Sequence, residues 1–202
     1  MPTVVITADH DEFVANLLRV MHPLMRAKVS AYNEADTGRK RFAFVVHPRH
    51  VISDAMIQTW VEHAHENPLL RHAQLNPRDF SVHKITDFIS QNRLRQTTLC
   101  RQIYRKFGGE YQIALMLPTA DGAAVALVFN RAYDFDERDR QLLALLQPIV
   151  AALYARIQTI TNLQSADHSQ TSAKSRQSIR RELKKIRLSR REIEVLPLLL
   201  QG

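Results

Sequence analysis

The sequence is poor in the features that mark secreted and membrane-spanning proteins. Cys100 is the single cysteine among 202 residues, which excludes an internal disulfide framework and fits a reducing compartment. The N-terminal residues MPTVVITADHDEF lack a basic flank followed by a long apolar run, and no stretch approaches the ~18 uninterrupted apolar residues of a membrane span. We therefore expect a cytoplasmic protein.

Motifs of catalysis and metal binding are also missing. The chain has no zincin His-Glu-x-x-His, no phosphate-cradling loop and no nucleophile elbow. His63 and His65 lie two positions apart on a predicted helix and should face away from each other, and His47 and His50 have no ligand at metal-binding spacing. A buried structural role fits Cys100 better than a nucleophilic one. The sequence thus indicates no catalytic residue, no metal site and no cofactor.

What the chain does have is the composition of a globular protein with a basic end. Hydrophobic residues make up 45% and charged residues 24%, which suits one domain with a core and an appendage. From Ser165 to Gly202, nine Lys and Arg oppose four acids, so this tail carries +5 of the formal net charge of +8. Concentrated positive charge favours a polyanionic partner. Taken alone, however, it is more often a solvated helix face.

The chain divides into a domain over 1–164, a linker over 165–178 and a further segment over 179–202. The linker, SADHSQTSAKSRQS, is polar and lacks apolar periodicity. Within the domain, periodicity and turn signals predict helices over 11–26, 53–65, 85–109 and 136–164, and strands over 27–36, 40–48, 110–118 and 123–132. The predicted fold class is α+β, an antiparallel sheet covered by helices on both faces and closed by a long helix.

Alternation along the third and fourth predicted strands gives the sheet two unlike faces. One face is bulky and apolar, while the other carries alanines flanked by Gln112 and Asn130. Small side chains leave space and amides supply hydrogen bonds, which is the composition of a small-molecule pocket. Alternatively, the alanines merely let a helix approach closely. The residues predicted to approach a cavity between the sheet and the central helices are Ser30, Tyr32, Trp60, Tyr104, Gln112, Met116 and Asn130.

Several stretches together carry a family resemblance: AYNEAD, NPLLRH, ITDFISQNRLRQTTL, YQIALMLP, ALVFNRAYDFDERDRQLLALLQPIV and LSRREIEVLPLLLQG. From about Arg26 onward, the chain resembles LuxR-type transcriptional regulators with a GAF-like sensor domain. The last stretch is the most specific and is similar to the first helix and turn of the family's helix-turn-helix. The resemblance implies a ligand-sensing domain followed by an incomplete helix-turn-helix, without the recognition helix that enters the major groove. Pro197 departs from the pattern, because a proline inside a helix removes a backbone hydrogen bond.

The last predicted helix of the domain is longer than a small sheet can cover, since about 29 residues span roughly 43 Å. Its apolar residues recur every three or four positions, which predicts pairing with the same helix of a second copy. The predicted dimer residues are Leu146, Ile149, Leu153, Ile157 and Ile160. Packing against the 11–26 helix could instead take up the first half of this stripe, and Pro148 predicts a bend.

These patterns favour a ligand-responsive, DNA-binding transcriptional regulator, of which this chain is mainly the sensor and dimerisation part. The residues expected to face DNA phosphates are Arg180, Arg181, Lys184, Lys185, Arg187, Arg190 and Arg191. The alternative is a dimeric small-molecule-binding module or decoy that does not bind DNA itself. An enzyme is disfavoured by the missing acid–base and metal constellations. The expected partners are DNA in the complete protein, an unidentified small-molecule effector and a second copy, and no membrane.

Overall fold

The computed structural model of the chain describes residues 8–36, 41–118 and 124–169. The chain divides into two compact units with a boundary between Tyr154 and Ala155, and the fold described below is that of the first unit. Its elements follow one another as α1 (Ala8–Leu24), β1 (Val29–Asp36), β2 (Arg41–His47), η1 (Arg49–Val51), α2 (Asp54–His63), η2 (Ala64–Glu66), α3 (Pro68–Leu75), β3 (His83–Lys84), η3 (Ile85–Asp87), α4 (Gln91–Leu94), η4 (Cys100–Tyr104), β4 (Tyr111–Leu117), β5 (Ala124–Arg131) and α5 (Glu137–Ser169). Helix α5 begins in the first unit and ends in the second.

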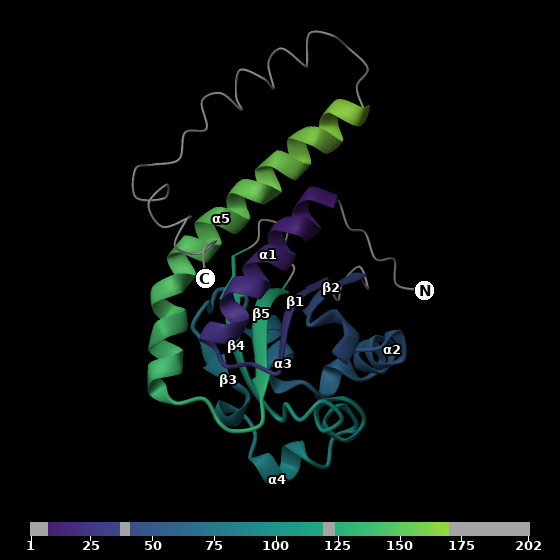
Figure 1. Cartoon of the computed structure of the whole chain (residues 1–202), viewed down its shortest axis with the longest axis vertical. Coiled ribbons are helices and arrows are strands. Elements are labelled where there is room, and N and C mark those ends of the chain that lie inside the picture. Colours follow the sequence, from purple (N-terminus) through teal and green to yellow (C-terminus); the bar gives the residue numbers. More distant parts are fainter. Residues whose placement is uncertain (1–7, 37–40, 119–123, 170–202) are drawn as a thin grey trace. The chain divides into compact units, whose positions relative to one another are not determined.

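The sheet has the strand order β2-β1-β5-β4-β3, and every neighbouring pair is antiparallel (Figure 1). The four predicted strands are confirmed as β1, β2, β4 and β5. The fifth strand, β3, was not predicted; it consists of His83 and Lys84, which pair with Ala114 and Ile113 of β4. Two residues are too few to show an alternating pattern in a sequence.

One face of the sheet is tightly packed. Ile113, Leu115, Leu127 and Phe129 point to this face and are completely buried. Helix α1 covers it, with Leu17, Leu18 and Met21 buried (Figure 1). The part of α5 in the first unit also buries Leu143, Val150 and Tyr154.

The opposite face is covered by α2, α3 and η4, which confirms the α+β prediction of a sheet with helices on both sides. The packing here is looser. Helix α2 has no buried residue, although Met56, Ile57 and Trp60 are apolar. Strand β2 has no buried residue either over 42–47. The space between this face and its helices forms the candidate site.

The predicted helix over 85–109 is wrong as a single element. The segment folds as the 3₁₀ turn η3, the short helix α4 and the π-helical turn η4. Side chains compete with a continuous helix here: Asp87 accepts a hydrogen bond from the Lys84 amide at 2.8 Å, and the Thr97 hydroxyl accepts one from the Cys100 amide at 3.1 Å. Gly108, with a φ of 68°, ends the segment as predicted.

Two further differences concern helix boundaries. Helix α2 is capped by the Ser53 side chain, as predicted, but a further helix, α3, follows it after the 3₁₀ turn η2. Asn67 caps α3 and Pro68 occupies its first turn, where a proline is well tolerated. Helix α5 continues through Pro148 to Ser169, which extends it into the predicted linker. The rest of the linker and the segment over 179–202 lie outside the described residues.

Among the described residues, one segment is long and apolar enough to cross a membrane by length and composition, Glu137–Thr161 in α5. Leu143 and Val150 of this segment are buried. Tyr154 in the same segment is hydrogen-bonded to Tyr32 of the sheet. The part of this segment up to Tyr154 therefore packs on the core of the first unit.

Candidate ligand-binding site

Two adjoining cavities lie on the loosely packed face of the sheet. The larger holds about 530 Å³ of space that no atom fills, its open mouth included, and the smaller holds about 400 Å³ by the same measure. Both are lined by Asn33, Trp60, Asn67 and Val128. The apolar lining with a few amide groups is the composition of a small-molecule site.

The cavities exist because the sheet presents small side chains between larger ones. Cross-strand partners share a face, so the register places Ala31 beside Val128 and Ala114 beside the same valine. Ala126 lies opposite both Asn33 and Met116. The alanine-bearing face predicted from β4 and β5 is confirmed, and β1 extends it.

A hydrogen-bonded polar group sits between the two cavities. The Asn67 amide donates to the Tyr104 hydroxyl at 3.1 Å and to the Gln112 side-chain oxygen at 3.4 Å. Its own oxygen accepts from the amides of Leu69 and Leu70 at 2.9 and 3.2 Å, which are the first free amides of α3. The helix cap therefore holds the polar centre of the site in place.

Burial raises the pKa of Tyr104, although hydrogen bonds from Gln112, Asn67 and Trp60 act in the opposite direction. The phenol is therefore neutral at physiological pH and serves as a hydrogen-bonding group. Trp60 stands edge-on to Phe44 of β2, with ring centroids 5.0 Å apart, and forms the outer wall of the cavities.

Two further amides face the site. Asn130 is buried and donates to the Gly109 carbonyl at 3.3 Å. Asn33 is half-buried, lines both cavities and makes no side-chain hydrogen bond within the described part of the chain. Its amide is therefore available to a bound molecule.

The lining of both cavities is uncharged. The described residues around them are aliphatic or aromatic apart from the amides of Asn33, Asn67, Gln112 and Asn130, the Tyr104 hydroxyl and the Trp60 indole. Moving a charge from water into such a lining without a counter-charge is costly. The chemistry of the site thus suits a neutral, mainly apolar molecule with a few hydrogen-bonding groups.

Five of the seven residues predicted to approach the cavity do so. Trp60, Tyr104, Gln112 and Asn130 line the larger cavity, and Met116 lines the smaller one. Whether they bind a ligand stays a prediction.

The placement of Ser30 and Tyr32 beside the cavity is wrong. The Ser30 hydroxyl lies 2.9 Å from the His22 ring in α1, and the Tyr32 hydroxyl lies 2.9 Å from that of Tyr154 in α5. Both side chains project to the packed face because residues of β1 alternate, and it is Ala31 and Asn33 that face the cavity.

Sequence reasoning missed Asn33 and Asn67. Asn33 could not be assigned to the cavity from the sequence, because the two faces of β1 are known only once its register with β5 is known. Asn67 did carry a signal: an asparagine directly before a proline is a typical start of a helix.

Other sequence predictions concern residues away from the cavities. Cys100 is fully buried, as expected, and burial raises the pKa of its thiol. His63 and His65, expected to face apart, have ring centroids 6.1 Å apart, because α2 ends at His63 and a 3₁₀ turn follows.

The predicted dimer stripe is not the buried face of α5. Leu146, Ile149 and Leu153 are half-buried, and Leu145 is 75% exposed. Ile157 and Ile160 lie in the second unit. Dimerisation stays a prediction, and the basic residues expected to face DNA all lie outside the described residues.

The fold and its cavities define a class of domain: an antiparallel sheet of the GAF-like type, one face packed and the other hollow. No protein-family model matches the sequence, and no curated protein matches it. Solved structures do.

The ligand-binding domain (LBD) of VqsR from Pseudomonas aeruginosa is similar with a TM-score of 0.56 and 12% identity, over 73% of this chain and 90% of that one. A GAF domain/HD domain protein from Geobacter sulfurreducens is similar with a TM-score of 0.52 and 17% identity, over 75% of this chain and 95% of that one. Escherichia coli SdiA reaches a TM-score of 0.42 at 15% identity, over 84% and 76% of the two chains, a likeness too distant to inform the fold. The first two likenesses establish a GAF-like fold.

Proposed function

We propose that this chain is the sensor part of a LuxR-type transcriptional regulator, and that its two cavities bind a neutral, mainly apolar effector. The observation that carries the proposal is the hollow, uncharged face of the sheet beneath α2. A folded domain normally fills its core to a high and even density. An open hollow with an apolar lining and a few placed amides, beside a packed face, has the composition of a small-molecule site, and we infer that a molecule occupies it.

The wall of the cavities supports an effector that orders the domain. Met56, Ile57 and Trp60 of α2 are only half-buried, because the space beneath them is not filled by protein. A bound molecule would bury their inner surfaces, and any ligand that binds only the folded state stabilises it.

We propose binding, not catalysis, as the role of the cavities. Their described lining holds no carboxylate, histidine or lysine, and the Tyr104 hydroxyl, with its raised pKa, does not exchange a proton near neutral pH. General acid–base chemistry needs at least one group that does.

The assignment to a regulator rests on three observations. The final residues LSRREIEVLPLLLQG resemble the first helix of the LuxR-type DNA-binding motif, and the tail carries most of the net positive charge. The fold is similar to that of the ligand-binding domain of VqsR. A dimeric binding module without DNA binding is the alternative, and the DNA titration described in the Discussion separates the two.

The cavity assignment can be tested with Prodan, an uncharged aromatic ketone whose emission shifts in apolar surroundings. We expect saturable binding to the purified chain. Ala31→Phe fills the larger cavity and Ala126→Phe the smaller, and at least one of them should weaken Prodan binding by about tenfold, which corresponds to about 1.4 kcal/mol. Asn33→Leu should still bind Prodan, but more weakly, because the variant lacks the amide that would donate a hydrogen bond to the Prodan carbonyl.

The control is Ala55→Phe, which makes the same change on the exposed side of α2. This variant should bind Prodan like the unsubstituted chain. Absence of saturable binding, or equal losses in Ala55→Phe and both cavity variants while circular dichroism shows folded protein, would exclude the cavities as the binding site.

A further inference from the structure

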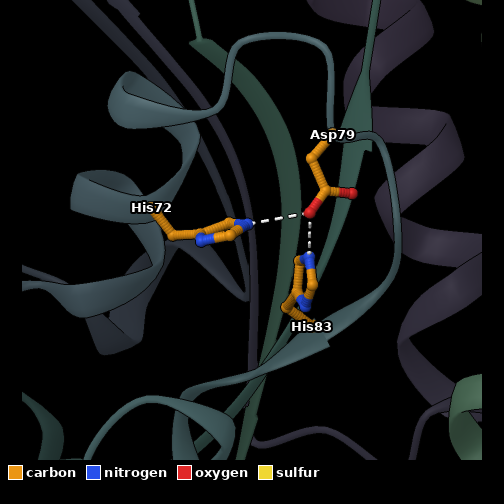
Figure 2. Close-up of side chains that lie close together, drawn as sticks. All are labelled: His72, Asp79 and His83. Carbon is orange, nitrogen blue, oxygen red and sulfur yellow. Dashed lines mark hydrogen bonds and ion pairs between the residues drawn. The ribbon is translucent and has the colours of Figure 1, made fainter.

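Two histidines and an aspartate converge on one point at the edge of the domain, outside the cavities (Figure 2). His72 comes from α3, Asp79 from the loop that follows it, and His83 from β3. The Asp79 oxygen Oδ2 lies 2.9 Å from Nε2 of His72 and 3.0 Å from Nε2 of His83. The two imidazole rings are 4.6 Å apart, edge to face.

The surroundings hold these three side chains in place. The other Asp79 oxygen, Oδ1, accepts a hydrogen bond from the Ser81 amide at 2.9 Å, which turns Oδ2 toward the histidines. The Phe88 ring stacks on His72 with centroids 4.6 Å apart and also contacts His83 at 5.2 Å. The three side chains keep between 18% and 32% of their surface exposed, so the cluster is open to solvent.

The Asp79 carboxylate accepts hydrogen bonds from both histidines and from the Ser81 amide. It offers a negative oxygen between two imidazole nitrogens, which is a ligand set that divalent transition metals prefer.

The geometry points to a binding site for a divalent transition-metal ion of the Zn²⁺ type, with His72, Asp79 and His83 as its three protein ligands. Their ligand atoms already lie within 4.8 Å of one another. In a tetrahedral site with ligand distances of ~2.0–2.1 Å, neighbouring ligand atoms are roughly 3.3 Å apart, so small side-chain rotations suffice. Three protein ligands leave the fourth position to water or to a ligand from solution.

Metal binding at Nε2 requires that each imidazole carry its proton on Nδ1. In the metal-free state both Nε2 atoms donate to Asp79, which can only accept. On metal binding the proton of each neutral ring moves through solvent from Nε2 to Nδ1, which frees the Nε2 lone pair for the ion. Nδ1 of His83 lies 4.0 Å from the Asp87 carboxylate. Nδ1 of His72 lies 3.2 Å from the side-chain nitrogen of Asn76, and a 180° flip of that amide presents its oxygen as the acceptor.

The site joins two parts of the fold. His72 is on α3, whose Leu69, Leu70 and Ala73 line the smaller cavity, and His83 is on the edge strand β3. An ion bound here would fasten one wall of the smaller cavity to the sheet. The inference stands without the proposed function, because it rests on the three ligands alone.

The test uses the full chain without affinity-tag histidines. We expect Zn²⁺ titrated by calorimetry to bind at one ion per chain, and Co²⁺ to give the visible absorption of a site with low coordination number. His83→Gln and Asp79→Asn should each weaken Zn²⁺ binding by about tenfold or more, because removal of a ligand exceeds the 10–100-fold effect of removing a residue that only supports a ligand. His50→Gln removes an exposed histidine elsewhere and should bind Zn²⁺ normally.

A readout on the unsubstituted chain keeps the test independent of whether the variants fold. In long-range ¹H–¹⁵N spectra of the imidazole rings, one equivalent of Zn²⁺ should shift the Nε2 resonances of two histidines, and these should be His72 and His83. The proposal is overturned if Zn²⁺ shows no saturable binding, if other histidines respond, or if His50→Gln weakens binding as much as His83→Gln. In that case the three residues are only a hydrogen-bonded clamp between α3 and β3.

Discussion

The hydroxyls of Tyr32 and Tyr154 lie 2.9 Å apart and join the middle of the sheet to α5. Both tyrosines are buried, and the Tyr32 hydroxyl also donates to the Glu34 carboxylate at 2.9 Å. Burial is the main reason that the pKa of Tyr32 is raised, so its phenol stays protonated. Because neighbouring residues of β1 face the cavities, this strand connects the hollow side of the domain to the helix on its packed side.

The hydrogen bond between Tyr32 and Tyr154 predicts a measurable effect on stability. Tyr154→Phe removes one hydroxyl and should lower the free energy of unfolding by about 1 kcal/mol, since Tyr32 keeps Glu34 as a partner. Urea denaturation followed by circular dichroism measures the change. Tyr133→Phe is the matched control, because Tyr133 is 50% exposed and its substitution should lower the free energy of unfolding by less than about 0.5 kcal/mol. Equal decreases in the two variants would contradict this prediction.

Arg131 is the buried cation that anchors the start of α5. Its guanidinium contacts the Asp139 carboxylate at 2.5 Å, donates to the carbonyls of Met25 and Asp134, and stacks over Phe135 at 3.9 Å. Lysine cannot replace a fork of five donors. We expect Arg131→Lys to lower the free energy of unfolding by about 3 kcal/mol, because the ammonium keeps the charge but leaves buried carbonyls without a donor, which costs about 1–3 kcal/mol for each.

The control for Arg131→Lys is the same substitution in an exposed ion pair. Arg95 contacts Glu110 at 2.8 Å, but its side chain is 51% exposed against 3% for Arg131. Arg95→Lys should therefore cost less than about 1 kcal/mol. Urea denaturation of the two variants measures both changes. A comparable shift of the urea midpoint in both would show that the buried Arg131 guanidinium contributes no more to stability than the exposed Arg95.

Self-association through the apolar stripe of α5 is predicted from Leu146, Ile149, Leu153, Ile157 and Ile160. Ile157→Glu would place an unpaired carboxylate in such an interface and should shift the chain toward monomer. Sedimentation velocity over a range of concentrations measures this. Ala155→Glu, at an exposed position of the same helix, should leave the association unchanged. An unsubstituted chain that stays monomeric at high concentration would rule out the stripe as an interface.

The 202-residue chain is predicted to bind DNA weakly and without sequence preference, because the family resemblance assigns its tail phosphate-facing cations and only the first helix of the DNA-binding motif. Affinity should fall by roughly tenfold or more between low and physiological salt if several phosphates are engaged. Replacing Lys184 and Lys185 with alanine should make the affinity less dependent on salt, by about one unit of the log–log slope for each phosphate that is no longer neutralised. Competition titrations at two salt concentrations test this.

Two results of the DNA titration would change the proposed function. Preference for one duplex by more than about a hundredfold would mean that the chain holds a complete DNA-reading element. No binding even at low salt would favour the alternative of a binding module that acts without DNA.

Much of the fold was predictable because it depends on interactions between near neighbours. The two faces of β4 and β5 follow from alternation, the start of α2 from Ser53, and the stop after η4 from Gly108. Each of these depends on the local backbone, which a short stretch of sequence determines. Four of the seven predicted cavity residues line the larger cavity. Gln112 and Asn130 are on these strands, and Trp60 and Tyr104 are on helices that cover the sheet.

The segment over 85–109 shows where local reasoning failed. Its apolar spacing is helical, yet Asp87 and Thr97 hydrogen-bond to nearby backbone amides, and Arg95 turns outward to Glu110. A continuous helix and a broken segment are both compatible with the local sequence. Packing against the sheet selects the broken form, because Leu94, Leu99 and Ile103 are all buried in it.

By itself the sequence determined the α+β class, the antiparallel strands, the alanine-bearing face and the basic tail, since each follows from composition or from a period of two or 3.6 residues. Only the tertiary structure decided which residues of β1 face the cavity, that Asn67 holds Tyr104 and Gln112, and that His72, Asp79 and His83 meet. Those relationships join residues whose spacing along the chain follows no repeat. They arise because the sheet register and the turn after α3 bring distant side chains together, and no short stretch of sequence contains that information.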